Sequence, residues 1–127
     1  MLQVKAHLDH SKVCEGMGVF LDENIVKNTI VSEDNSFFTV VFSGKEIHDL
    51  PLHIKKRINE MNHFWIDSIG DWRFSLDDDR FICHSSFPNV KPSDDNQTRW
   101  VASMDIASGT ELTCDYRLLM PHRDQLP

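Results

Sequence analysis

The stretch RFICHSSFPN, residues 80–89, decides how the rest of the sequence is interpreted. It begins as a short apolar run, turns polar at His84 and Ser85, and stops at Pro88-Asn89. Proline has no backbone N–H and pushes the residue before it towards an extended conformation. The pattern therefore predicts a strand that ends abruptly and directs a histidine and two hydroxyls at a site.

Two further segments make this strand end specific. GMGVF occupies residues 16–20 and ELTCDY occupies residues 111–116. Two glycines one residue apart let a backbone approach a ligand closely or adopt a positive φ. The dinucleotide fingerprint GxGxxG is not met, because the third glycine is missing. A plain hairpin turn would explain this pair of glycines equally well if it stood alone.

Length, composition and charge bound the class of protein. The chain has 127 residues, the usual size of one domain, and 40% of them are hydrophobic, which is enough for one core. Its net charge of -7 disfavours a duplex nucleic-acid binder and would attract a basic partner, although acidic soluble domains are common. No apolar run is long enough to span a bilayer, and Met1 starts no signal-peptide pattern.

Cysteine and histidine usage adds expectations about redox state and metals. Cys14, Cys83 and Cys114 are odd in number and contain no CxxC pair, so we expect neither a disulfide framework nor a cysteine zinc site. A reducing, intracellular compartment fits best, with the cytoplasm favoured and a nuclear or host-directed location left open. His84 belongs to no HExxH or paired Cys/His spacing, so a structural hydrogen bond is favoured over a metal role.

Hydrophobic periodicity predicts several short strands and one clear helix. The helix starts near Pro51 and carries an apolar face of Ile54, Ile58, Met61 and Trp65. Residues 37–42 have the content of a buried strand, and residues 91–98 are expected to form an exposed loop. Other strands are expected near residues 4–8, 25–31, 72–76, 100–106 and 111–116.

The last of these strands is expected to alternate. Leu112, Cys114 and Tyr116 would share one face, with Glu111, Thr113 and Asp115 on the other. Asp77-Asp78-Asp79 is interpreted as a turn, since no EF-hand spacing follows it. Together these elements predict one α+β, mostly-β domain.

The three segments resemble the SET domain family of protein-lysine methyltransferases. Residues 80–89 resemble its RFINHSCxPN stretch, and ASMDIASGTELTCDY, residues 102–116, resembles its AxxDIxxGEELTxDY stretch. The resemblance covers residues 4–119 and predicts that residues 1–127 form a single minimal SET domain, without the cysteine-rich zinc segment that follows it in some members. It implies a fold of short strands in which the two C-terminal motifs form a knot-like crossing.

The resemblance also implies a cofactor and a substrate. Members bind S-adenosyl-L-methionine on one side of the crossing, and the target lysine of a basic protein or peptide enters a channel from the other. Carried over by position, Tyr116 is the catalytic residue at the channel floor. The implied channel residues are Cys114, Phe87, Trp72 and Phe74. The implied cofactor-binding residues are Gly16, Met17, Gly18, Arg80, Cys83, His84 and Tyr116.

The proposed role of Tyr116 agrees with its chemistry. Methyl transfer from a sulfonium mainly requires the amine to be held in line at near-attack geometry. An apolar channel lowers the pKa of the incoming ammonium, whereas a tyrosine with a pKa near 10 stays protonated at neutral pH. Its hydroxyl can therefore orient the amine. A core aromatic with a solvated hydroxyl is the structural alternative.

Departures from the family pattern keep other functions open. Cys83 stands where the family usually has Asn, Ser86 replaces the usual Cys, and Cys114 replaces a common Phe or Tyr that limits the number of methyls. Cys83 and the absence of further channel tyrosines motivate a second hypothesis, a catalytically weak or silent SET module that binds cofactor or a protein partner. An unrelated binding domain is the third. Neither direct nucleic-acid nor membrane binding is expected, and a second copy of the chain could complete the channel as a homodimer.

Overall fold

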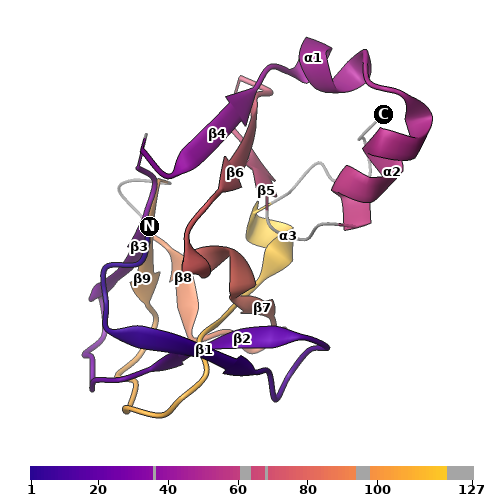
Figure 1. Cartoon of the computed structure of the whole chain (residues 1–127). Helices are drawn as coiled ribbons and strands as arrows, with labels where there is room; N and C mark the ends of the chain where they lie inside the picture. The colour runs from indigo at the N-terminus through magenta and orange to yellow at the C-terminus, as the bar shows by residue number, and fades with distance from the viewer. Residues whose placement is uncertain (36, 61–63, 68, 94–97, 120–127) are drawn as a thin grey trace.

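The computed structural model describes the chain except for residues 36, 61–63, 68, 94–97 and 120–127 (Figure 1). No helix in the described ranges is long and apolar enough to cross a membrane. The strands are β1 (Ala6–His10), β2 (Met17–Leu21), β3 (Ile30–Glu33), β4 (Thr39–Phe42), β5 (Phe64–Ile66), β6 (Trp72–Ser75), β7 (Cys83–His84), β8 (Val90–Pro92), β9 (Arg99–Ala102) and β10 (Thr113–Cys114). The helical elements are α1 (Gly44–His48), α2 (Leu52–Glu60), the 3-10 turn η1 (Asp78–Phe81) and α3 (Tyr116–Leu119).

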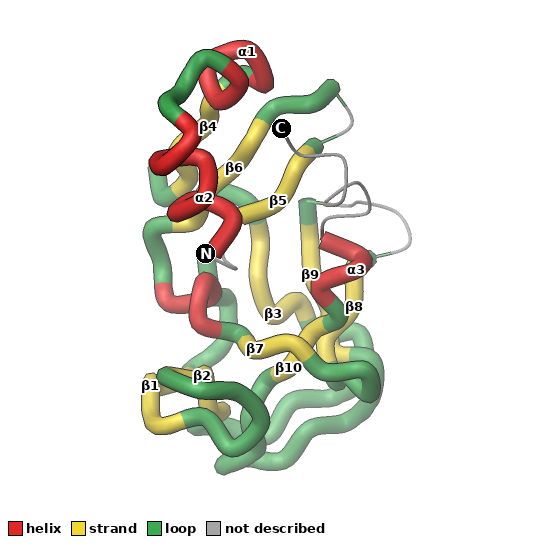
Figure 2. Tube along the Cα trace, turned by 90° about the vertical axis from the view of Figure 1, so that its right-hand side faces the viewer, coloured by secondary structure: helices red, strands yellow, loops and turns green. Residues whose placement is uncertain are grey.

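Small sheets make up most of the fold. β1 pairs antiparallel with β2, and two three-stranded antiparallel sheets have the orders β3-β9-β8 and β4-β6-β5. β7 and β10 form a separate two-stranded parallel pair. Figures 1 and 2 place the β1–β2 hairpin at one end of the molecule and α1 and α2 at the other. The α+β, mostly-β class with α2 as the main helix is confirmed.

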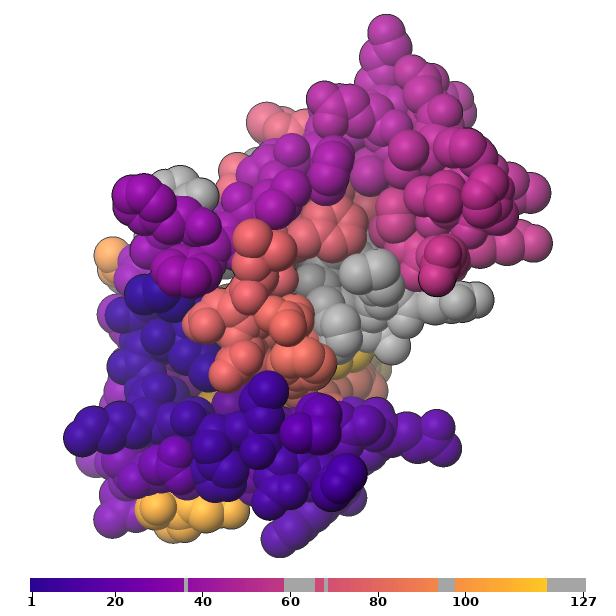
Figure 3. All heavy atoms as spheres, in the orientation of Figure 1, coloured from indigo at the N-terminus to yellow at the C-terminus, as the bar shows by residue number. Residues whose placement is uncertain are grey.

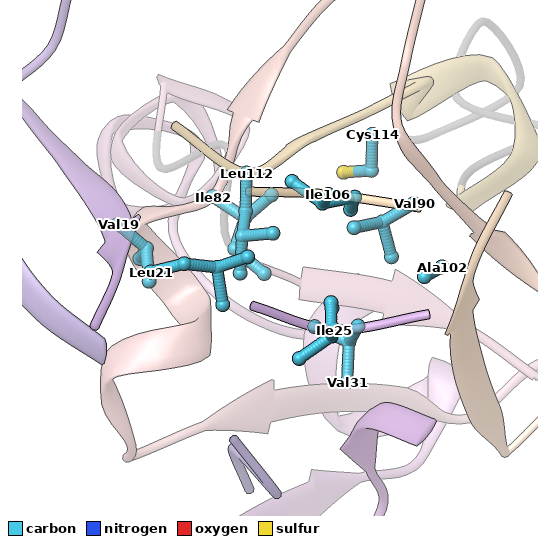
Figure 4. Close-up of a cluster of buried hydrophobic side chains, with 10 residues drawn as sticks. All are labelled: Val19, Leu21, Ile25, Val31, Ile82, Val90, Ala102, Ile106, Leu112 and Cys114. Atoms are coloured by element: carbon cyan, nitrogen blue, oxygen red, sulfur yellow. The ribbon is translucent and has the colours of Figure 1, made fainter. Parts of the chain in front are cut away.

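The main core lies between the hairpin, the β3-β9-β8 sheet and the β7–β10 pair (Figure 4). Its apolar side chains come from segments far apart in sequence, so their burial fixes several connections at once. Leu112 is fully buried, and its backbone N–H donates to the carbonyl of Val19 at 2.8 Å. The ten buried members are Val19, Leu21, Ile25, Val31, Ile82, Val90, Ala102, Ile106, Leu112 and Cys114.

A second, smaller core holds the two helices against the β4-β6-β5 sheet. Ile47 of α1 and Trp72 of β6 are its buried members, and Phe74 packs beside them. Ser43 caps α1, because its hydroxyl accepts a hydrogen bond from the backbone N–H of Glu46 at 3.1 Å. Such a cap satisfies one of the unpaired donors at a helix start.

The N-terminal segment is tied to η1. The amino group of Met1 lies 3.0 Å from a carboxylate oxygen of Asp79, and the N–H of Leu2 donates to Asp77 at 2.7 Å. In Figure 3 the segment around η1 lies between the N-terminal residues and the β4-β6-β5 sheet. The aspartate run expected to form a simple turn is thus a 3-10 turn that anchors the N-terminus.

Three expectations from periodicity are corrected. The strand expected to be buried at residues 37–42 is the edge strand β4, and Val40, Val41 and Phe42 are exposed, because only one side of it has a neighbouring strand. The helix α2 ends at Glu60 and Trp65 belongs to β5, while Met61 lies outside the described residues. The loop expected at residues 91–98 begins as strand β8.

The alternation expected in residues 111–116 is also wrong. Strand β10 covers only Thr113–Cys114, all five residues 111–115 are buried, and Tyr116 begins α3. The segment runs beside β7 and also contacts β2, so it is enclosed on more than one side. An alternating pattern is expected only where one face of a strand is exposed to solvent, and residues 111–115 have no such face.

We expect Leu112→Ala to lower the free energy of unfolding by about 2–5 kcal/mol, because it removes most of a fully buried side chain from the main core. Urea denaturation followed by circular dichroism measures this loss. Leu52→Ala is the matched control, since Leu52 is 67% exposed and should change stability by only about 0.5 kcal/mol. Equal losses for the two variants would contradict the assignment of the core.

Candidate functional site

The site is built where β7 and β10 run side by side (Figure 2). Cys83 pairs with Thr113 and His84 with Cys114 in parallel register. The ladder continues beyond the strands, since the N–H of Ser85 donates to the carbonyl of Cys114 at 2.9 Å. The two C-terminal motifs of the sequence are therefore adjacent.

Asn89 locks the two motifs together with both ends of its side chain. Its amide nitrogen donates to the carbonyl of Glu111 at 2.9 Å, and its amide oxygen accepts from the N–H of Thr113 at 2.9 Å. The hydroxyl of Thr113 also accepts from the N–H of Asn89 at 3.3 Å. One side chain thus replaces a missing strand neighbour for residues 111–113, where unpaired backbone groups would be costly.

Tyr116 lies two residues after β10, and it contacts residues 80–89 in two places. Its hydroxyl donates to the carbonyl of Ile82 at 2.7 Å, and its backbone N–H donates to Nδ1 of His84 at 3.0 Å. The His84 and Tyr116 rings lie 5.3 Å apart between centroids. Nδ1 of His84 therefore acts as an acceptor, as expected for a structural histidine that fixes this corner. The tyrosine ring is held from both its backbone and its hydroxyl.

Glu111 holds the loop that precedes β2. Its buried carboxylate accepts from the hydroxyl of Ser11 and from the N–H of Lys12, both at 2.7 Å. The same Ser11 hydroxyl oxygen accepts from the N–H groups of Val13 and Cys14, both at 3.0 Å. A chain of hydrogen bonds thus runs from the C-terminal motif into the loop that leads to the glycines.

The two glycines meet different requirements. Gly16 has a φ of 97°, in the region that favours glycine, and a Cβ placed there would meet nothing within 4 Å. Gly18 has ordinary φ, but a Cβ there would lie 2.6 Å from a carboxylate oxygen of Glu111. Gly16 therefore shapes the turn, and Gly18 makes room for the carboxylate that anchors it.

We expect Gly18→Ala to cost about 1–3 kcal/mol of stability, because the added methyl group displaces the Glu111 carboxylate from its hydrogen bonds to Ser11 and Lys12. In a Glu111→Ala background the same change should cost less, since the obstacle is gone. Urea unfolding of the two single variants and the double variant gives this coupling energy. An equal cost of Gly18→Ala in both backgrounds would rule out the carboxylate as the reason for glycine.

Asp115 and Arg117 form the strongest electrostatic pair of the site. The Arg117 side chain donates to both carboxylate oxygens of Asp115, at 2.7–3.2 Å, and holds the pKa of that carboxyl down to about 2, although burial acts in the opposite direction. His84 lies 3.9 Å from the same carboxylate. The aspartate next to Tyr116 is therefore ionised at neutral pH.

This pair predicts an acid-dependent part of the stability. An unfolded Asp has a pKa near 3.9 and the folded Asp115 one of about 2, so its contribution is complete above pH ~4 and is lost as pH falls towards 2. Arg117→Gln should make the free energy of unfolding fall less steeply over this range. Urea unfolding at a series of pH values measures the slope. Arg117→Lys, which keeps the charge, should stay closer to wild type; a Gln variant with the wild-type slope would refute the assignment.

The structure places the four expected channel residues in different surroundings. Cys114 is part of the main core, where burial raises the pKa of its thiol to about 12. Trp72 and Phe74 belong to the second core, and Phe87 is 92% exposed. The free chain does not gather these side chains around one channel, and their role stays a prediction.

The side chain of Arg80, which the resemblance places near the cofactor, is bound to carbonyl groups of its own segment. Its guanidinium donates to the carbonyls of Leu76 and Asp77 and lies 4.5 Å from the ring centroid of Phe81. These contacts hold η1 in its 3-10 conformation. Among the described residues, no group of three His, Cys, Asp or Glu side chains is arranged to hold a metal ion.

The sequence predicts no disulfide framework, but the structure contains one disulfide bridge. Cys14 and Cys83 form a disulfide bridge, which links the loop before β2 to β7, while Cys114 is a free, buried thiol. The two partners are 69 positions apart and their spacing resembles no known motif, so only the tertiary fold shows that they meet.

Three further residues of the site were not singled out from the sequence. Asn89 and Glu111 lie inside the two motifs, but no role was assigned to either side chain, and Ser11 lies in no motif. Their partners are 22 to 100 positions away.

Comparisons with known proteins agree with this geometry. A sequence model described as SET domain matches residues 16–117, which is most of the chain. The chain belongs to the SET domain family. No curated protein sequence matches it.

Solved structures share the fold at low sequence identity. A putative histone methyltransferase from Plasmodium falciparum is 20% identical with a TM-score of 0.59, and the match covers 91% of this chain and 95% of that one. A humanized mutant of the Chaetomium thermophilum Polycomb Repressive Complex 2 bound to the inhibitor GSK126 is 22% identical with a TM-score of 0.68, covering 98% and 17%.

A third structure, ctPRC2 in an autoinhibited conformation bound to S-adenosylmethionine, is 20% identical with a TM-score of 0.68, covering 96% and 16%. This chain therefore spans about a sixth of the length of the Polycomb chains that it matches. At these identities the likeness shows the fold, and membership of the family supports a methyltransferase-type role.

Proposed function

We propose that the chain is an S-adenosylmethionine-dependent methyltransferase that transfers a methyl group to a lysine side chain of a basic protein. The observation that carries this proposal is the position of Tyr116, the only tyrosine of the chain, whose hydroxyl donates to the Ile82 carbonyl at the crossing of the two motifs. The two hydrogen bonds of Tyr116 fix both its backbone and its hydroxyl at the place where residues 80–89 and 111–116 meet.

Contacts link the glycine turn, β7 and Tyr116, three of the segments proposed to hold the cofactor. Cys83 Sγ lies 3.5 Å from the carbonyl oxygen of Met17, which joins β7 to the glycine turn. His84 contacts Tyr116, and both Met17 and His84 are exposed. Gly16 leaves open space where a side chain would stand. These contacts connect the turn, the β7 end and Tyr116, which supports the proposal that one ligand contacts all three.

Tyr116 is proposed to position the reacting amine. When bound, S-adenosylmethionine supplies an electrophilic methyl group on a sulfonium. Because the Tyr116 hydroxyl donates its hydrogen bond to the carbonyl oxygen of Ile82, its oxygen would act as the acceptor towards a lysine amine. Holding the amine in line is the main requirement of this displacement. His84 acts as a positioning residue, because it holds the Tyr116 backbone.

The net charge favours a basic partner. At -7 the chain attracts a lysine-rich protein or peptide and repels nucleic acid. We include an intracellular location in the proposal. A homodimer stays a hypothesis, and a light-scattering mass that remains monomeric at high concentration would exclude it.

We expect Tyr116→Phe to remain folded, to bind S-adenosylhomocysteine normally and to lose methyl transfer on the order of a hundredfold, because misplacing the amine by about 1 Å costs that much. The lost hydrogen bond to Ile82 should lower stability by no more than about 1–1.5 kcal/mol. Calorimetric titration, urea unfolding and a peptide methylation assay measure the three quantities.

Thr29→Val is the matched control for this variant. It also deletes a hydroxyl that donates to a backbone carbonyl, that of Val26 at 2.7 Å, but it does so outside the site. Its methyl transfer should match that of wild type. Full activity of Tyr116→Phe on the same peptide would remove the catalytic assignment.

The alternative is a catalytically weak or silent SET module. The observation in its favour is that Cys83, at the position of the family's usual Asn, is bound to Cys14 instead of presenting an amide. A reduced wild type that binds S-adenosylhomocysteine but methylates no basic peptide would establish this alternative.

A further inference from the structure

The Cys14–Cys83 bridge joins two segments that differ in exposure. Cys83 lies in β7 and is 2% exposed, whereas Cys14 lies in an exposed loop formed by residues 12–16. The Ser11 N–H donates to the Gly16 carbonyl at 2.9 Å and closes the base of this loop. A soluble thiol can therefore approach the bridge from the side of Cys14.

The bridge also lies within the surface proposed to hold the cofactor. Sγ of Cys83 is 3.4 Å from the hydroxyl oxygen of Ser11 and 3.5 Å from the Met17 carbonyl oxygen. The loop leads directly into the glycine turn, and Cys83 precedes His84. The inference that follows rests on the proposed function, because both segments hold residues that are assigned to cofactor binding.

The spacing of the two segments leaves no room between them. The Cα atoms of Cys14 and Cys83 are 6.2 Å apart. Two chains that enclose a third extended chain are about 9.5 Å apart, twice the spacing of neighbouring strands. A chain-like ligand, such as the methionine half of S-adenosylmethionine, therefore cannot pass between residues 14 and 83 while the bridge holds them.

We propose that Cys14 and Cys83 form a reversible thiol–disulfide site that closes the cofactor surface when oxidised and opens it when reduced by a dithiol. Reduction removes the covalent link and leaves the loop held by hydrogen bonds at Ser11 and Glu111. These bonds anchor the start of the loop. The N–H groups of Val13 and Cys14 still donate to the Ser11 hydroxyl, but in an exposed loop water can replace these bonds, and residues 13–15 can then move away from β7. A reducing compartment would keep the surface open.

The reaction is a two-step exchange with a dithiol reductant. One reductant thiolate attacks Cys14 Sγ, forms a mixed disulfide with it and releases Cys83 as a thiolate, which takes up a proton. The second reductant thiol then displaces Cys14 and closes the reductant's own disulfide. Two electrons and two protons pass from the reductant to the protein, so the exchange is balanced.

The third cysteine of the chain, Cys114, takes no part in this thiol–disulfide exchange. Cys114 is buried in the main core, and burial raises the pKa of its thiol to about 12, so almost no thiolate is present at neutral pH. The chain therefore has a single pair that can be oxidised without opening its core. Thiol–disulfide chemistry is confined to the cofactor surface.

The experiment compares oxidised and dithiothreitol-reduced wild type by calorimetric titration with S-adenosylhomocysteine. We expect reduced protein to bind at least tenfold more tightly, and Cys14→Ser to bind like reduced wild type under both conditions. Val13→Ser is the matched loop control, since it keeps the bridge and should show the wild-type redox dependence. Equal affinities of oxidised and reduced wild type would overturn the proposal.

Two further readouts are independent of catalysis. Because the reduced form binds the ligand more tightly, saturating S-adenosylhomocysteine should shift the glutathione-buffered equilibrium of the pair towards thiols, as counted by alkylation and mass spectrometry. Tryptic cleavage after Lys12, in the loop, should also be faster in reduced protein relative to cleavage after Lys27, which is exposed elsewhere.

The proteolysis separates the two proposals. A chain that binds no S-adenosylhomocysteine in any form, but whose Lys12 cleavage depends on the redox state, would refute the proposed function and keep the thiol site. In such a chain, Lys12 cleavage that is equal in both redox states would refute the thiol site as well.

Discussion

The hydrogen bonds of the Asn89 side chain are the constraint on which the site depends. The amide group is bound at both ends by the backbone of residues 111–113, a segment in which Thr113 alone is in register with β7. Through these bonds, Asn89 at the end of residues 80–89 fixes the start of residues 111–116. The positions of Glu111 and Tyr116, at either end of the same segment, follow from it.

Glu111 and Tyr116, at the two ends of this segment, form hydrogen bonds with different parts of the chain. Glu111 reaches Ser11 and sets the loop before the glycine turn, whereas Tyr116 reaches Ile82 and His84 at the other end of the crossing. A segment of six residues thus connects the proposed cofactor surface with the proposed catalytic hydroxyl. Its complete burial at residues 111–115 makes the arrangement rigid, because close-packed interiors do not deform gradually.

The sequence predicted the fold class and the family, because both motifs are local strings of residues. It did not predict which faces are covered: Val41 is β-branched in a strand and yet exposed, because β4 is an edge, a property of tertiary pairing. The Cys14–Cys83 bridge and the Ser11–Glu111 bond join residues too far apart for spacing to carry information. The sequence predicts that Gly18 admits a ligand, whereas the atom nearest to where its side chain would stand is a carboxylate oxygen of the chain itself.

The contact between Leu112 and Val19 has a consequence for how the protein folds. These residues lie near opposite ends of the chain, and their pairing is long-range, so the main core cannot close before residue 112 is available. Contacts of this kind slow folding, since loop closure costs entropy before packing repays it. During synthesis the β1–β2 hairpin emerges before residue 112 and leaves Val19 and Leu21 uncovered until then, so the chain at this stage needs protection from aggregation.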